Sequence, residues 1–234
     1  MRFAAAIFVG LLLASAARAD KPTRAAIIAY NTSCATSDQR ADFIAEFGTD
    51  FAGLDLSGVD FRGPHRAYVE SNLRGADFRG ANLSGAIFGA AVLDGADLTD
   101  ADLSSAQFVT ASLQGAQLRG ANLAGALFMQ TSLAGVDAAE ADFSTADITG
   151  CDFSRANLQG ATLAGAKEIY WLLNFSDADL SDADLHGMVL RRAEFQRATL
   201  VRANLQGADL ESADFSDADL TDANLTEVKI SHAD

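Results

Sequence analysis

An all-β solenoid, a coil built from four five-residue sides, is the fold class that this sequence predicts. Three observations indicate it. From residue 71 on, one large apolar residue recurs every five positions, as Leu73, Phe78 and Leu83 do. A small residue lies two positions before each of them, as Ala76 does before Phe78. Phenylalanines also recur 20 residues apart, in the two series Phe88, Phe108, Phe128 and Phe175, Phe195, Phe215.

The period itself argues for a chain that turns every five residues. It fits neither an amphipathic α-helix nor a long strand. In an extended segment, residues two apart point to the same side, so the large and the small residue can both face inward. The polar and small residues around them suit outward positions and turns. One unit cannot bury its own apolar face, so the units must stack around a shared axis, and the 20-residue recurrence places like on like every four units.

The repeating unit, as in Ala76-Asp77-Phe78-Arg79-Gly80, resembles that of the pentapeptide-repeat family over about residues 49–234. The resemblance implies a right-handed quadrilateral parallel β-helix with the Leu/Phe and the small residue inward. It also implies one known role, which is mimicry of DNA that shields a topoisomerase.

Two steps of 12 residues interrupt the period, from Phe61 to Leu73 and from Leu163 to Phe175. We expect each step to hold one side widened by two residues, which gives about nine coils. Side A then carries Phe51, Leu73, Leu93, Leu113, Leu133, Phe153, Phe175, Phe195 and Phe215. Side D carries Phe88, Phe108, Phe128, Ile148, Leu190, Leu210 and Ile230. Both widened sides, GPHRAYVES near Tyr68 and GAKEIYWLL near Trp171, fall on side D.

The N-terminus is expected to be a signal peptide at residues 1–19. Arg2 gives a positive start, an apolar run follows to Leu13, and Ala17-Arg18-Ala19 forms a small-x-small cleavage site. The apolar run is too short to span a bilayer comfortably, and a buried helix is the alternative. We therefore predict a periplasmic or secreted protein without membrane insertion after cleavage.

Residues 20–48 are expected to cap the first coil, and residues 49–234 to form the β-helix, because open strand edges must be covered. Thr36 and Gln39 form a capping-box pattern, which predicts a helix over about 37–47. The run Ala25–Ala29 with Tyr30 can add to this cap or form a strand. The C-terminal residues 226–234 show no cap, so an end-to-end homodimer and a frayed monomer both remain open.

Charge and cysteine content narrow the partners. Without residues 1–19 the chain has 15 basic and 32 acidic residues, a net charge of −17. Such a chain repels nucleic acid and anionic membranes. Cys34 and Cys151 lie in distant coils, so two free thiols are expected. Outward residues 20 apart form ladders of alternating charge, Asp177-Arg197-Asp217 and Asp182-Arg202-Asp222, and Arg191 faces Glu211.

Side D is unusually apolar on its outer surface. Ile87, Val109, Leu127 and Met129 occupy outward positions where other sides often carry Asp or Asn. The widened sides, with Tyr68 at one end and Tyr170 and Trp171 at the other, flank these residues. An exposed apolar patch indicates either a protein partner or an internal cover, here the loops or residues 20–36.

The search for chemistry finds no convergent site. His65, His186 and His232 lie far apart, and no phosphate loop, metal motif or nucleophile elbow occurs. We expect no enzyme activity, no cofactor and no metal, and an unknown protein partner in the cell envelope. Two alternatives remain: a DNA mimic that protects a topoisomerase, and a secreted protein whose acidic run Ser176–Leu185 binds Ca²⁺.

Overall fold

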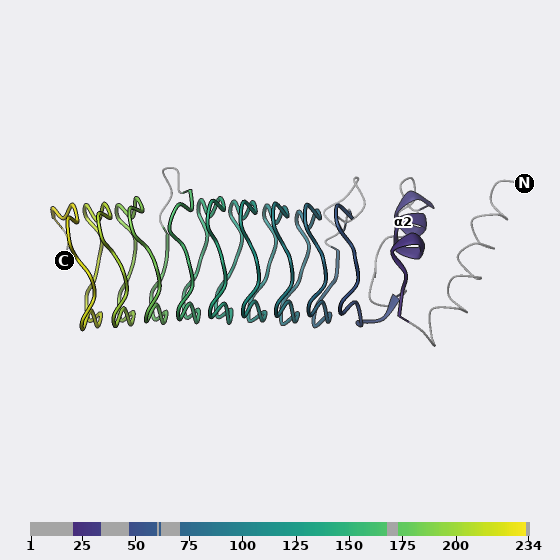
Figure 1. The fold of residues 1–234 in the computed structure, drawn as a ribbon, viewed down its shortest axis with the longest axis horizontal. Coiled ribbons are helices and arrows are strands. Elements are labelled where there is room, and N and C mark those ends of the chain that lie inside the picture. The colour runs from purple at the N-terminus through teal and green to yellow at the C-terminus, as the bar shows by residue number, and fades with distance from the viewer. Residues whose placement is uncertain (1–20, 34–46, 60, 62–70, 168–172, 233–234) are drawn as a thin grey trace, which may run out of the picture.

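The computed structural model describes residues 21–33, 47–59, 61, 71–167 and 173–232. They form a rod of stacked coils with one helix, α2 (Arg24–Ser33), at its N-terminal end (Figure 1). Beyond α2, the described chain alternates between parallel β-bridges and turns, and each side contributes a single bridged residue to the ladder. No helix in the described part is long and apolar enough to cross a membrane.

The parallel bridges establish a coil of four sides. They join residues 20 apart from Asn72 and Val92 to Asp147 and Lys167, and again from Asn174 and Glu194 onward. We keep the name side A for the side of Leu93 and side D for the side of Phe88. Side B carries Phe78 and Leu98, and side C carries Leu83 and Leu103.

The backbone of each side bonds to the coil above and to the coil below. On side D, the Phe88 N–H donates to the Gln107 carbonyl at 2.7 Å, and the Gln107 N–H donates to the Ala86 carbonyl at 2.9 Å. The Ala91 N–H donates to the Phe88 carbonyl at 2.8 Å and closes the turn. These bonds run along the rod, so the middle of a side presents no free strand edge.

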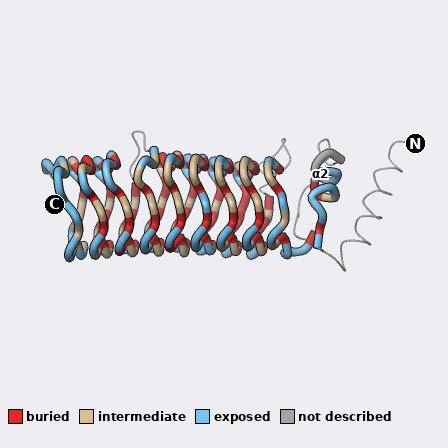
Figure 2. Tube along the Cα trace, viewed as in Figure 1, coloured by how far each residue is buried: buried red, intermediate tan, exposed pale blue. Residues whose placement is uncertain are grey.

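The core is a column of side chains along the axis of the rod, as the prediction from the repeat required. The rings of Phe88, Phe108 and Phe128 are fully buried, and the alanines two positions earlier are buried too (Figure 2). Their centroids lie 4.9 and 4.8 Å apart with interplanar angles of 5° and 3°. Like therefore stacks on like at the spacing that the backbone ladder imposes.

The predicted assignment of the first 12-residue step is wrong. Asp50 pairs with Asp77 and Asp55 pairs with Asn82, so Phe51 lies on side B and not on side A. The step from Phe61 to Leu73 contains no side of its own, because Phe61 already stacks on Phe88 on side D. Aromatic packing explains this register. Phe51 and Phe78 stack at 5.0 Å, and Phe61 and Phe88 stack at 4.8 Å.

The second step follows the prediction. Lys167 pairs with Asp147 on side D, and Asn174 pairs with Asp152 on side A, 22 residues apart. The two extra residues therefore lie beside side D. The first insertion follows Phe61, so it also begins at side D. The total of about nine coils stays a prediction, reduced by the one side that the first step does not contain.

Helix α2 begins after Thr23, whose hydroxyl oxygen accepts a hydrogen bond from the Ala26 N–H at 3.2 Å. This bond is that of an N-cap residue. Ile27 is fully buried and belongs to the same apolar cluster as the coils. The run Ala25–Ala29 is therefore helical and not a strand. The predicted helix at about 37–47 lies outside the described residues except for Phe47, which is buried.

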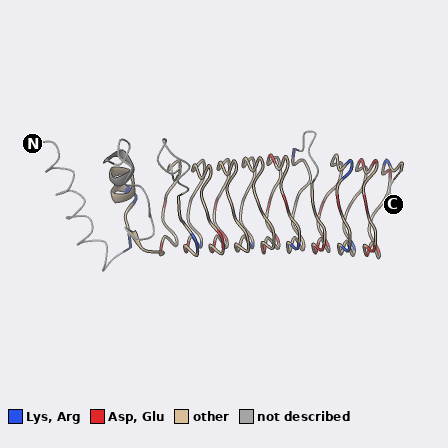
Figure 3. Cartoon of the chain, turned by 180° about the vertical axis from the view of Figure 1, so that it is seen from behind, with Lys and Arg blue, Asp and Glu red and all other residues tan. Residues whose placement is uncertain are grey.

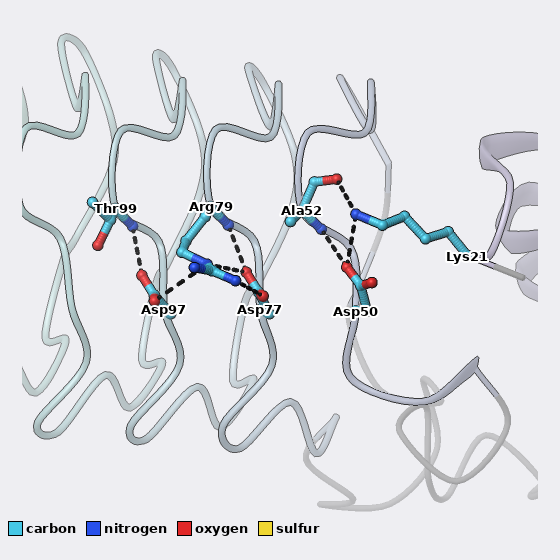
Figure 4. Close-up of polar contacts among 7 residues, drawn as sticks. All are labelled: Lys21, Asp50, Ala52, Asp77, Arg79, Asp97 and Thr99. Atoms are coloured by element: carbon cyan, nitrogen blue, oxygen red, sulfur yellow. Dashed lines mark hydrogen bonds and ion pairs between the residues drawn. The ribbon is translucent and has the colours of Figure 1, made fainter.

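Two cations fasten the segment that contains α2 to the first coil. The Lys21 ammonium lies 2.9 Å from the Asp50 carboxylate and donates to the Ala52 carbonyl at 3.0 Å (Figure 4). The Arg24 guanidinium donates to the Ser57 carbonyl at 2.6 Å. These contacts place the described part of the N-terminal segment on sides B and C of the first coil.

The inward positions lose their burial at the other end of the rod. Phe215 and Leu220 are half-buried, and Leu225 and Ile230 are 43% and 58% exposed. Each of these residues would be covered if one more coil lay on top. The end-to-end homodimer predicted from the sequence stays a prediction.

Candidate protein-interaction site

The candidate site is an apolar strip on side D, defined here as Ile87, Val109, Leu127 and Met129. Val109, Leu127 and Met129 are 36%, 37% and 42% exposed, and Ile87 is half-buried. Ile87 and Leu127 occupy the position before the inward Phe, with Gln107 between them in the ladder. Val109 and Met129 occupy the position after it. The stacked rings of Phe88, Phe108 and Phe128 behind the strip fix the spacing of its members.

The corner that follows the strip carries side chains where the backbone favours glycine. Ala90, Thr110 and Gln130 all adopt left-handed backbone conformations, with φ of 57°, 59° and 56°. For a β-branched residue such as Thr110 this conformation costs about 1 kcal/mol or more. The Thr110 hydroxyl donates to the Val109 carbonyl at 2.7 Å. Three successive coils thus retain side chains beside the strip at a conformational cost.

The surface around the strip is acidic. Between residues 82 and 152, all of which the structure describes, there are nine Asp or Glu residues and a single basic residue, Arg119. Arg119 lies on side B and forms an ion pair with Glu140. Sides A, C and D therefore carry only negative charge next to the strip, whereas acidic and basic residues together occur along the rod as a whole (Figure 3).

The other predicted members of the patch, Tyr68, Tyr170 and Trp171, lie outside the described residues. The predicted internal cover by residues 20–36 is described only for residues 21–33. These lie at the N-terminal end of the rod, with their contacts on the first coil, so this part of the segment does not cover the strip (Figure 1).

One exposed apolar residue on side D was missed. Val189 is 50% exposed and precedes Leu190, just as Ile87 precedes Phe88 and Leu127 precedes Phe128. The same position in the repeat could have identified it from the sequence. Its ladder neighbour is Asp209, and the second insertion separates it from the strip.

The acidic positions serve the turns, as the repeat predicted. Asp50, Asp77 and Asp97 each accept a hydrogen bond from the backbone N–H two residues later, at 3.1 to 3.2 Å (Figure 4). In the acidic run, Asp179 and Asp184 do the same. This is the local bond of an Asx turn. Among the described residues, no group of three or more His, Cys, Asp or Glu converges in a way that could hold a metal ion.

The histidines and cysteines do not come together in the described part of the chain. The His186 ring nitrogen Nδ1 lies 2.8 Å from the exposed Asp184 carboxylate, and His232 lies in the last coil. His65 and Cys34 lie outside the described residues. Cys151 is a free, buried thiol whose Sγ lies 3.1 Å from the Phe128 carbonyl. Burial raises the pKa of the Cys151 thiol well above its ordinary value, so this thiol is unreactive.

The predicted ladders of opposite charge are present. The Arg197 guanidinium holds Asp177 through two bonds of 2.7 Å, and Arg202 holds Asp182 in the same way. The guanidinium groups lower the pKa values of both carboxyl groups through these hydrogen bonds. Both pairs are exposed, so each stabilises the fold only weakly.

The Arg191 pair differs from its prediction. Its guanidinium lies 3.4 Å from Glu211, as expected, but its shorter contacts are with Asp209, at 2.8 and 3.0 Å. The Asp209 side chain is only 9% exposed. The bonds from Arg191 hold the pKa of the Asp209 carboxyl below its usual range. The sequence analysis missed Asp209 because it compared Arg191 only with the equivalent position one coil later.

This chain belongs to the pentapeptide-repeat family. The model of pentapeptide repeats matches eight copies, over residues 71–109, 111–150, 139–167, 174–207 and 203–234. The fold of this family is the right-handed quadrilateral β-helix, and the 20-residue ladder found above agrees with it. No curated protein matches the sequence.

Solved structures of similar proteins come from several sources. QnrB1, a plasmid-mediated fluoroquinolone resistance protein, is 18% identical over 78% of this chain and 93% of its own, with a TM-score of 0.46. HetL, from the cyanobacterium Nostoc sp. strain PCC 7120 and involved in regulating heterocyst differentiation, is 29% identical over 79% and 81%, with a TM-score of 0.24. A thylakoid-lumen protein of Arabidopsis thaliana is 28% identical over 60% and 71%, with a TM-score of 0.21. At these TM-scores, none of the three indicates what this chain binds.

We predict that Arg191→Ala lowers the melting temperature at pH 7 more than Arg197→Ala does. The two guanidinium groups are 57% and 58% exposed, but the Asp209 side chain is 9% exposed and the Asp177 side chain 39%. Removing Arg191 therefore leaves a nearly buried carboxylate without its cation. Thermal denaturation followed by circular dichroism measures the difference. Equal shifts in the two variants would contradict the importance of Asp209.

The pH dependence follows from the lowered pKa of Asp209. A carboxyl group whose pKa is lowered by folding stabilises the protein above its ordinary value of about 3.9, and this stabilisation is lost as the pH falls through the lowered value. The gap between the wild type and Arg191→Ala should therefore be constant near neutral pH. It should shrink as the pH falls below about 4.

Proposed function

We propose that this chain is a non-catalytic protein-binding or scaffold protein of the cell envelope, and that side D holds its partner. The observation that carries the proposal is the exposed strip of Ile87, Val109, Leu127 and Met129. Elsewhere on the rod, the position before the inward residue is mostly Asp, Asn, Ser or Thr. The strip is therefore a departure from the rule of the repeat.

The architecture supports a role in binding. A solenoid presents a long and rigid surface whose outward residues do not determine the fold, since each coil is held by its inward residues and its backbone. Pentapeptide-repeat proteins are generally non-catalytic binding or structural proteins. The apolar side chains of the strip contribute nothing to the core, so a partner gives the simplest physical reason for them.

The proposed location rests on the N-terminal sequence alone. The positive start, the apolar run and the cleavage pattern before Asp20 support export to the periplasm or beyond. The alternative of a topoisomerase-protecting DNA mimic requires the cytoplasm. A reporter fused after residue 40 separates these functions, and we expect it to be found outside the inner membrane. Retention of the fusion in the cytoplasm would contradict the envelope proposal.

The binding role is tested by cross-linking in the periplasm, followed by mass spectrometry, of the wild type and of the double variant Val109→Asp/Met129→Asp. We expect the wild type to yield a specific cross-linked protein and the double variant to lose it. Both residues are exposed on the surface, so the variant should fold and melt like the wild type.

The matched control is Gln159→Asp, which changes an exposed residue on side B. It should keep the cross-linked partner. If the double variant retains the partner, or if it no longer folds, side D is not the binding face.

A further inference from the structure

The strip on side D cannot be bound by addition of a β-strand. Ile87 donates its backbone N–H to the Val59 carbonyl, Phe88 donates to Gln107, and Gln107 donates to Ala86. The Leu127 N–H likewise donates to Ala106. The backbone groups of the ladder in this part of side D are thus used within the rod. A partner must therefore bind through side chains, and recognition through an added strand is excluded here.

The spacing of the coils selects the secondary structure of the partner. The rings behind the strip repeat at 4.9 and 4.8 Å, so the outward residues recur at the same interval along the rod. Successive turns of an α-helix are about 5.4 Å apart. Side chains on one face of a β-strand are about 6.6 to 6.8 Å apart. Over two coils a helix laid along the rod drifts by about 1 Å, whereas a strand drifts by almost 4 Å.

The charge around the strip selects the flanks of the partner. The nearest charged positions on sides A, C and D, such as Asp94, Asp102, Asp142 and Asp147, are all acidic. The single basic residue between 82 and 152, Arg119, lies on side B. An apolar ligand bordered by lysine or arginine would meet complementary charge on both sides of the strip, and an acidic one would be repelled.

We propose that the strip binds a basic amphipathic α-helix lying along the axis of the rod. The apolar stripe of the helix would fit between Ile87, Val109, Leu127 and Met129, and its flanking lysines or arginines would face the acids of sides A and C. This inference rests on the proposed binding function and names the class of partner. Recognition is of the helix-on-apolar-face kind, read at the i, i+3, i+4 and i+7 positions of the partner.

The test uses synthetic peptides and the whole chain. The probe is an amidated peptide of about 15 leucines and lysines with leucine at the i, i+3, i+4 and i+7 spacing of an apolar helical stripe. A peptide of the same composition with strictly alternating leucine and lysine serves as the strand-forming control. Titration calorimetry measures affinity, and circular dichroism measures the helix formed on binding. We expect the helical peptide to bind and to gain helicity, and the alternating peptide to bind at least about tenfold more weakly.

Variants separate recognition by the strip from general attraction between charges. Met129→Asp should weaken binding of the helical peptide at least about tenfold, although it adds a negative charge that would favour a basic ligand. Met129→Leu should keep the affinity within about twofold. Gln159→Asp on side B, which adds the same charge, should leave the affinity unchanged or slightly higher.

Three results would overturn the inference: no binding of the helical peptide, equal binding of both peptides, or tighter binding to Met129→Asp than to the wild type. Each of them leaves the cross-linking test independent. A strip that holds its natural partner but ignores these helices would keep the binding function and refute only the helical, basic class of partner.

Discussion

The structure depends on the stacking of one coil on the next at about 4.8 Å. The backbone ladder imposes this interval, and the inward side chains must fill the interior at the same interval without gaps. Stacked phenylalanines meet both conditions, with Phe88, Phe108 and Phe128 on side D and Phe175, Phe195 and Phe215 on side A nearly parallel. The small residue beside each large one leaves room for the chain to turn. Fold stability is thus set inside the rod.

The outward positions are consequently free to vary, and side D uses this freedom differently from the others. Sides B and C carry many Asp and Asn residues, whose carboxylate or amide oxygens bind the next turn. Side D replaces them with apolar residues over three coils and retains Ala90, Thr110 and Gln130 at corners that favour glycine. Both insertions in the repeat lie beside the same side. A binding surface can arise in this way without disturbing the core.

The four-sided coil and its inward residues could be predicted from the sequence because the period of five and the recurrence at 20 leave few alternatives. The place of Phe51 could not be predicted from spacing alone. A step of 12 residues fits one widened side as well as one corner with an insertion. Only the pairing of Phe51 with Phe78 and of Phe61 with Phe88 distinguishes them. The strip was predicted from its positions in the repeat, whereas Val189 and Asp209 were missed because their counterparts were not compared along the whole of side D.

Helix α2 shows the limit of local signals. The capping-box pattern at Thr36 and Gln39 favoured a helix over 37–47, whereas Thr23 caps a helix that begins at Arg24. Its position is set by tertiary contacts, namely the burial of Ile27 and the bonds of Lys21 and Arg24 to the first coil. These contacts join residues some 30 positions apart, and no local pattern in the sequence reports them.

The most direct test of the 20-residue stacking is the removal of chain from the middle of the rod. Deleting residues 131–150 removes one coil and brings each remaining residue over its equivalent, whereas deleting residues 131–145 removes three sides and shifts the register by one side. Thermal denaturation of the two shortened proteins should show a cooperative transition for the first and none for the second. If both deletions melt alike, the coils do not depend on like stacking on like, and the account of the fold is contradicted.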